Sequence, residues 1–139
     1  MSYCIYLRKS RADSENPLWT EEEVLARHEQ TLTELAINRG YSVTKIFREV
    51  VSGETLAARP LMQQLLSEVE SGLWDGVLVM EVERLARGNS IDQGIVSQAF
   101  KYSNTLIITP NKVYNPANEF DEEYFEFGLF MSRREYKTI

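Results

Sequence analysis

A tyrosine, an arginine and a serine stand at alternate positions where the first apolar run of the sequence gives way to charge. Residues 4–7 read as a short buried strand, which we expect to end where the charged run 8–11 begins. Because side chains alternate along a strand, Tyr6, Arg8 and Ser10 should project to one side. Two interpretations are open. Either the arginines are solvated surface charges and Ser10 begins a turn, or Ser10 is a nucleophile whose target is a phosphate held by arginines.

Further hydroxyl and guanidinium groups follow two other segments that have strand character. Ser52 follows residues 41–51, and Arg84 and Arg87 follow the apolar run 77–80. Ligands of parallel α/β sheets gather at the carboxyl ends of the strands, so these segments could bring their side chains to one edge. Arginine holds two phosphate oxygens with a planar, permanently charged fork. The combination favours phosphoryl transfer in which a serine is the nucleophile and no metal is needed.

The elements that must position these groups carry clear boundary signals in the first half of the chain. Thr20 and Glu23 have the capping-box spacing, which predicts the start of a helix, and Gly40 predicts its end. Pro60 suits the first turn of a second amphipathic helix, which should close at residues 71–72. Strand and helix therefore alternate from the start of the chain.

The second half continues the alternation. Ser90 and Gln93 predict the start of a third helix, a strand is expected at 106–108, and residues 109–118 read as a loop before a last helix. The pattern predicts an α/β fold with a mainly parallel sheet of four to five strands flanked by helices. The apolar face of the third helix should consist of Ile91, Ile95, Val96, Ala99 and Phe100.

Composition limits the classes of function. One cysteine and one histidine cannot assemble a Cys/His metal cluster. That histidine, His28, falls on the inward face of the first helix and is expected to be a packed core residue. Acyl transfer by a triad is poorly supported, because no G-x-S-x-G elbow surrounds Ser10. No apolar run reaches the length of a membrane span and no leader opens the chain, so we expect a cytoplasmic protein.

Three short motifs occur in order along the chain, and together they carry a family resemblance. They are Tyr6-Leu7-Arg8-Lys9-Ser10, then Val51-Ser52-Gly53 with Arg59 following, then Glu83-Arg84-Leu85-Ala86-Arg87. This ordered set resembles the N-terminal catalytic domain of the serine recombinases, the resolvase and invertase superfamily. The end of the chain looks most like the large serine recombinases of phage integrases and mobile transposons. The resemblance implies a resolvase-like catalytic domain that acts in site-specific DNA recombination.

The resemblance also implies a role for each matching residue. Ser10 would attack a DNA phosphodiester and form a covalent 5′-phosphoserine intermediate, releasing a 3′ hydroxyl that is later used for religation. No metal, nucleotide or other cofactor would be needed. Glu83 stands where an aspartate is usual, and His28 stands where a glutamine is usual. The residues matched to phosphate binding are Arg8, Arg59, Arg84 and Arg87, and those matched to supporting positions are Tyr6, Ser52, Glu83 and His28.

The resemblance further implies a domain organisation and partners. Residues 1–117 would form the catalytic core, and residues 118–139 would begin a long assembly helix that is truncated before separate DNA-binding domains. The apolar stripe within 120–131 is wide, which suggests a partner helix or deep burial. Family members work as dimers that pair into a synaptic tetramer. DNA would be bound mainly through the missing C-terminal domains, so the net charge of −6 is no contradiction and the isolated fragment should be inactive.

Two rival interpretations predict no reaction at all. The first is an α/β module whose arginines, Arg84 and Arg87 among them, bind phosphate or another anion without demanding anything of Ser10. The second is an assembly domain with a decayed active site, for which the departures at Glu83 and His28 give slight support.

Overall fold

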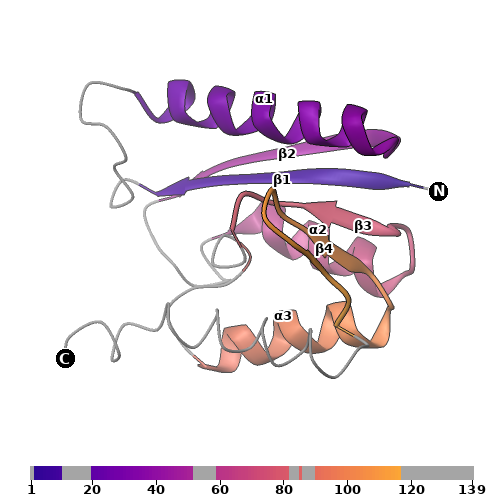
Figure 1. Ribbon diagram of the computed structural model, residues 1–139. Coiled ribbons are helices and arrows are strands. Elements are labelled where there is room, and N and C mark those ends of the chain that lie inside the picture. Colours follow the sequence, from indigo (N-terminus) through magenta and orange to yellow (C-terminus); the bar gives the residue numbers. More distant parts are fainter. Residues whose placement is uncertain (1, 11–19, 52–58, 82–84, 86–89, 117–139) are drawn as a thin grey trace.

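A sheet with helices packed on both faces forms the centre of the computed structural model (Figure 1). The structure describes residues 2–10, 20–51, 59–81, 85 and 90–116, and for residues 9, 10, 21, 51, 90 and 91 it describes the backbone alone. The predicted last helix after residue 117 lies outside these ranges. No helix within them is long and apolar enough to cross a membrane.

The five strands have the order β2-β1-β3-β4-β5. The first four run parallel and β5 pairs antiparallel with β4, which confirms the mainly parallel sheet. The segment predicted as a loop thus contains a short strand, because the Thr109 hydroxyl accepts a hydrogen bond from the Lys112 backbone N–H and closes a tight turn. The strands are β1 (Tyr3–Ser10), β2 (Val43–Val51), β3 (Gly76–Leu78), β4 (Leu106–Ile108) and β5 (Val113–Tyr114).

Local capping signals set the helix boundaries. The helices are α1 (Glu21–Arg39), α2 (Pro60–Glu70) and α3 (Ser90–Tyr102). The Thr20 hydroxyl accepts a hydrogen bond from the Glu23 N–H at 3.1 Å, so α1 begins where the capping-box spacing predicts. Gly40 ends α1 with a φ of 74°, a left-handed conformation that glycine adopts without strain. Pro60 opens α2, also as predicted.

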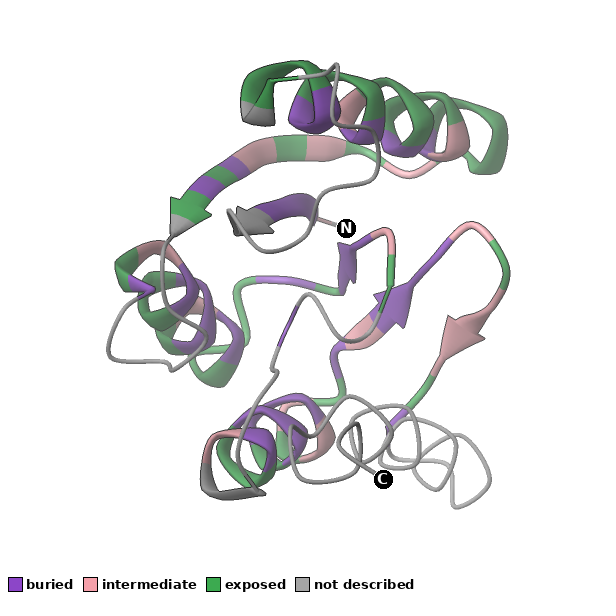
Figure 2. Ribbon diagram, turned by 90° about the vertical axis from the view of Figure 1, so that its left-hand side faces the viewer, coloured by how far each residue is buried: buried purple, intermediate pink, exposed green. Residues whose placement is uncertain are grey.

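Alternation along β1 divides the core between the two faces of the sheet. Cys4 and Tyr6 belong to a cluster with α2 and α3, whereas Ile5 and Leu7 belong to a cluster with α1. Figure 2 shows the buried side of α1 turned toward the strands and its exposed side turned away. Cys4 and Tyr6 therefore lie on the face that carries α2, and alternation places Arg8 on the same side.

Two strand ends differ from the prediction. β1 does not end at Leu7, because its backbone ladder with β2 continues to the pair Ser10 and Val51. The change from apolar to charged side chains ends the run of buried apolar residues but not the strand. β3 ends at Leu78, two residues before the end of the apolar run 77–80, although Val79 is still fully buried.

The predicted apolar face of α3 is too wide. Ile95 is 45% exposed, so its assignment to the core was wrong, whereas Val96, Ala99 and Phe100 are buried. Position 95 lies about 100° around the helix from 96, which takes it off the stripe that 96, 99 and 100 form. The side chain of Ile91 lies outside the described part of the structure.

Replacing Gly76 by alanine should destabilise the domain, because β3 packs tightly at that position. An added Cβ would lie 2.9 Å from Ile108 Cδ1 and from Tyr3 Cδ1 in the core. We expect the free energy of unfolding to fall by about 1–3 kcal/mol in urea titrations. Gly94→Ala in α3 is the matched control: its Cβ meets nothing within 4 Å, and the helix should gain roughly 0.5–1 kcal/mol. Equal stability of the two variants would contradict this packing.

Candidate active site

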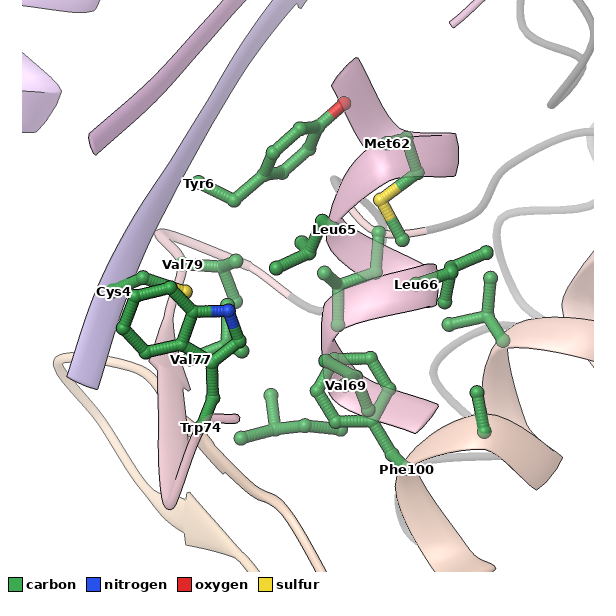
Figure 3. Close-up of a cluster of buried hydrophobic side chains, with 14 of the residues drawn as sticks. Cys4, Tyr6, Met62, Leu65, Leu66, Val69, Trp74, Val77, Val79 and Phe100 are labelled. Carbon is green, nitrogen blue, oxygen red and sulfur yellow. The ribbon is translucent and has the colours of Figure 1, made fainter. Parts of the chain in front are cut away.

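Two arginines, a tyrosine and a glutamate come together near the carboxyl ends of β1 and β2. Tyr6 and Arg8 belong to β1, Glu49 belongs to β2, and Arg59 directly precedes α2. Tyr6 and Arg8 are each 1% exposed, Glu49 is 4% exposed and Arg59 is fully buried. Figure 3 shows the Tyr6 side chain reaching from β1 toward the first turn of α2, near Met62.

The burial of Arg8 bears on the two interpretations of the first motif. Arg8 is not a solvated surface charge, because it is 1% exposed. The backbone of Ser10 pairs with β2 as the last residue of β1. Charged groups are rarely buried unless they are compensated or functional, so the interpretation that assigns these residues to a site is favoured. The Ser10 side chain itself is outside the described part of the structure.

The Tyr6 hydroxyl bridges a carboxylate and a guanidinium. It donates a hydrogen bond to Glu49 Oε1 at 2.6 Å. It accepts hydrogen bonds from Arg59 Nη2 at 3.0 Å and Nε at 3.3 Å. Arg59 Nε also lies 3.9 Å from Glu49 Oε1, at the outer limit of an ion pair. The tyrosine thus links the arginine to the carboxylate.

The same carboxylate caps α2. Glu49 Oε2 accepts from the Leu61 N–H at 2.8 Å, and Oε1 accepts from the Met62 N–H at 3.3 Å. Pro60 has no N–H, and the Arg59 side chain makes no capping hydrogen bond. A carboxylate satisfies the first N–H groups of a helix and interacts favourably with its dipole. Glu49 therefore fixes the turn that begins immediately after Arg59.

Positive charge is concentrated on this face of the sheet. Arg8 is the register partner of Glu49 on the neighbouring strand, so one carboxylate lies beside both buried arginines. The Arg59 guanidinium carbon also lies 5.6 Å from the centre of the Tyr6 ring, a cation–π distance. Such a group of guanidinium side chains suits an anionic ligand with several oxygens, such as a phosphate. Within the described residues, no group of three or more His, Cys, Asp and Glu side chains could hold a metal ion.

The environment keeps the Tyr6 hydroxyl protonated. Burial raises the pKa of Tyr6 most strongly, the Arg59 charge lowers it, and Glu49 raises it by its charge and its hydrogen bond. The net shift of this pKa is upward. A protonated hydroxyl can donate to Glu49 while its oxygen accepts from Arg59, which matches the observed geometry.

The structure brings some of the predicted site residues together but not all of them. Tyr6 and Arg8 stand at alternate positions of β1, which places them on one side of the strand as predicted. Arg59, the N-cap residue of α2, donates a hydrogen bond to the Tyr6 hydroxyl. His28 is buried on α1, which packs against the other face of β1, so it is not part of this cluster. The remaining predicted site residues lie outside the described ranges: Ser52, Glu83, Arg84 and Arg87.

Leu85 is the described residue of the motif that contains those two arginines. It is fully buried in the same hydrophobic cluster as Tyr6 and Met62. This one position of the motif therefore belongs to the core on the face of the sheet that carries Tyr6.

Glu49 is the site residue that the sequence analysis missed. The signal was present, because Glu49 follows Phe47 by two positions and alternation places both on the inward face of β2. A carboxylate at an inward position of a strand needs a hydrogen-bonding or charged partner. That requirement could have identified Glu49 as a candidate site residue.

Alkaline pH should destabilise the domain, and Tyr6→Phe should remove part of the effect. A group whose pKa is raised by folding contributes stability that is complete below its unfolded pKa, about 10 for tyrosine, and is lost as the pH rises toward its folded value. Since the pKa of Tyr6 is raised, the wild-type free energy of unfolding should fall more steeply above about pH 10 than that of Tyr6→Phe. The raised pKa values of Cys4 and Tyr3 act alike in both proteins. Urea titrations at a series of fixed pH values measure this. If the free energy of unfolding falls equally steeply with pH in wild type and in Tyr6→Phe, the prediction is contradicted.

Comparison with known proteins agrees with this fold. Three solved structures share the fold over most of the chain. The N-terminal catalytic domain of TP901-1 integrase has a TM-score of 0.68 at 20% identity and covers 99% of this chain and 97% of its own. A resolvase family site-specific recombinase from Streptococcus pneumoniae has a TM-score of 0.65 at 15% identity, and the match covers 91% of this chain and 84% of that one. The C-terminal catalytic domain of ISC1926 TnpA, an IS607-like serine recombinase, has a TM-score of 0.62 at 24% identity. That match covers 78% of this chain and 67% of the other.

The family match extends over almost the whole sequence. Residues 3–137 match the family described as Resolvase, N terminal domain. The fold, with its mostly parallel sheet, is the one that the structural neighbours share. The chain therefore belongs to the Resolvase N-terminal domain family and is a catalytic domain of a serine site-specific DNA recombinase.

Proposed function

We propose that Ser10 is the nucleophile of the recombination reaction and that Arg8 and Arg59 hold the DNA phosphate it attacks. The observation that carries this proposal is the burial of both arginines at the end of the strand that presents Ser10. Arg8 precedes Ser10 by two residues on β1. In an extended strand that spacing places two side chains on the same side, about 7 Å apart along the chain.

The proposed reaction is an exchange of phosphoesters. The Ser10 hydroxyl loses its proton and its oxygen bonds to phosphorus, while the bond from phosphorus to the 3′ oxygen of the DNA breaks. That oxygen takes up a proton and leaves as a 3′ hydroxyl, and the 5′ phosphate stays attached to the protein. Attack by a 3′ hydroxyl reverses the step and religates DNA. Because the number of phosphoester bonds is unchanged, no energy source is needed.

Arginine charge is the proposed means of stabilising the transition state. Negative charge on the phosphate oxygens develops in a site where fixed donors act strongly because water is excluded. Arg8 and Arg59 are already in such an environment. We assign Arg84 and Arg87 to the same phosphate, an assignment supported by the buried Leu85 between them. Tyr6, Ser52 and Glu83 are proposed as supporting residues, and no cofactor is assigned. His28, which is buried on the other face of β1, is left out of this set.

The domain organisation completes the proposal. The family acts on DNA and forms oligomers. We assign residues 1–117 to the catalytic core and 118–139 to the start of an assembly helix that leads to separate DNA-binding domains. Dimers would pair into a synaptic tetramer in the cytoplasm, with DNA bound mainly outside this chain.

Ser10→Ala in the full-length recombinase should abolish a covalent protein–DNA adduct. Wild type and variant are incubated with supercoiled DNA carrying candidate sites, quenched in denaturant and separated on a denaturing gel. Ser42→Ala is the matched control, because this exposed serine lies just before β2 at the other end of the strands. We expect adduct from wild type and Ser42→Ala only. An adduct from Ser10→Ala would refute the assignment, and none from wild type would favour the anion-binding module.

The isolated 139-residue domain should bind DNA weakly or not at all. Its net charge of −6 opposes the phosphate backbone, on which non-specific affinity mainly depends. A gel shift with site DNA and with unrelated DNA at low salt measures this. Tight binding by the isolated domain would contradict the proposal that separate domains supply most of the affinity.

A further inference from the structure

We propose that Glu49 is a positioning residue for recombination, acting through Tyr6 and the first turn of α2 to set the place and orientation of Arg59. This inference rests on the proposed function, in which Arg59 binds the DNA phosphate. Glu49 itself contacts Tyr6, Arg59 and the backbone of α2. Its carboxylate thus joins β1, β2 and α2 at a single buried point.

The first step of the argument concerns the direction of the tyrosine hydroxyl. Tyr6 has one hydroxyl proton, and it is directed to Glu49 Oε1 at 2.6 Å. The oxygen of Tyr6 is then left to accept from Arg59, which donates from both Nη2 and Nε. Those two donors define one edge of the planar guanidinium. Holding that edge fixes the plane of the group and the direction of its remaining donors.

The second step concerns the backbone of Arg59. Arg59 is the N-cap residue of α2, and its carbonyl accepts a hydrogen bond from the Gln63 N–H at 3.1 Å. Glu49 accepts from the next two available N–H groups, those of Leu61 and Met62. A shift of this turn would move the Cα of Arg59. Glu49 therefore restrains Arg59 at both ends, through its guanidinium and through its backbone.

The third step shows why an amide cannot replace the carboxylate. Both oxygens of Glu49 act as acceptors: Oε1 receives the Tyr6 hydroxyl and the Met62 N–H, and Oε2 receives the Leu61 N–H. Glutamine offers one oxygen and one NH₂ group. If the NH₂ group took the place of Oε2, it would face the Leu61 N–H, and if it took the place of Oε1, it would face the Met62 N–H and the Tyr6 hydroxyl. In both cases one donor would face another donor. Glu49→Gln keeps the size of the side chain but breaks this pattern.

The test is single-turnover cleavage by full-length Glu49→Gln, under conditions in which wild type forms its covalent adduct. A misplacement of about 1 Å can slow a reaction by roughly 100-fold, so we expect a loss of that order in the rate of adduct formation. DNA affinity, measured in parallel, should stay at the wild-type value, because we propose that DNA binds mainly through domains outside this chain. Adduct formation at the wild-type rate would overturn the proposal.

Glu68→Gln separates positioning from stability. Glu68 anchors the other end of α2, where its carboxylate accepts from Lys45 Nζ at 2.8 Å, Gln64 Nε2 at 3.0 Å and Trp74 Nε1 at 3.1 Å. Its substitution should lower the free energy of unfolding but leave cleavage close to the wild-type rate. If cleavage falls in step with stability in both variants, Glu49 has only a structural role and the proposal fails.

Tyr6→Phe keeps the proposal testable even if Glu49→Gln does not fold. It removes the bridging hydroxyl and leaves the cap of α2 intact, so cleavage should again be slowed. If both variants fold, Glu49→Gln should slow cleavage less in the Tyr6→Phe background than in wild type, because the two residues act on Arg59 through one path. The proposal would be overturned if Tyr6→Phe cleaved at the wild-type rate. It would also be overturned if the loss of cleavage rate in the double variant equalled the product of the losses in the two single variants. Cleavage by Ser10→Ala would instead refute the proposed function.

Discussion

A single buried carboxylate, that of Glu49, holds together the part of the fold that carries the site. It lies beside two buried arginines, accepts the Tyr6 hydroxyl and caps α2. Burying cations is unfavourable unless they are compensated, and removing one partner of a buried ion pair typically destabilises a protein by about 3–5 kcal/mol. Among the described residues of these strands, the buried charged side chains Arg8 and Glu49 are register partners, at the place where we propose the chemistry. On this proposal, stability and function depend on the same contacts.

β1 pairs with its two neighbours over different lengths. β3 pairs with β1 only over Tyr3–Ile5, whereas β2 pairs with β1 along its whole length to Ser10. The second half of β1, which carries Tyr6 and Arg8, is therefore paired with β2 and not with β3. β2 is also the strand that carries Glu49, the register partner of Arg8.

Local signals were enough to predict the framework but not the contacts that join it. Thr20, Gly40 and Pro60 act within one turn of their own position, and each marked a helix boundary correctly. Alternation likewise predicted that Tyr6 and Arg8 share a face. Glu49 was missed because its partners lie 43 residues before it and 12 and 13 residues after it, and no local pattern encodes such pairing. The end of β1 was missed for a related reason, since its partner strand, not its own polarity, decides where pairing stops.

The most direct test of the central claim is chemical analysis of the wild-type adduct. Nuclease treatment followed by protease digestion would leave a short nucleotide on one peptide, and fragmentation in the mass spectrometer would locate it. The account predicts a 5′ phosphate ester on Ser10, within the peptide that contains Arg8 and Lys9, together with a free 3′ hydroxyl on the cleaved DNA. A nucleotide attached to any other residue, or attached through its 3′ phosphate, would contradict it.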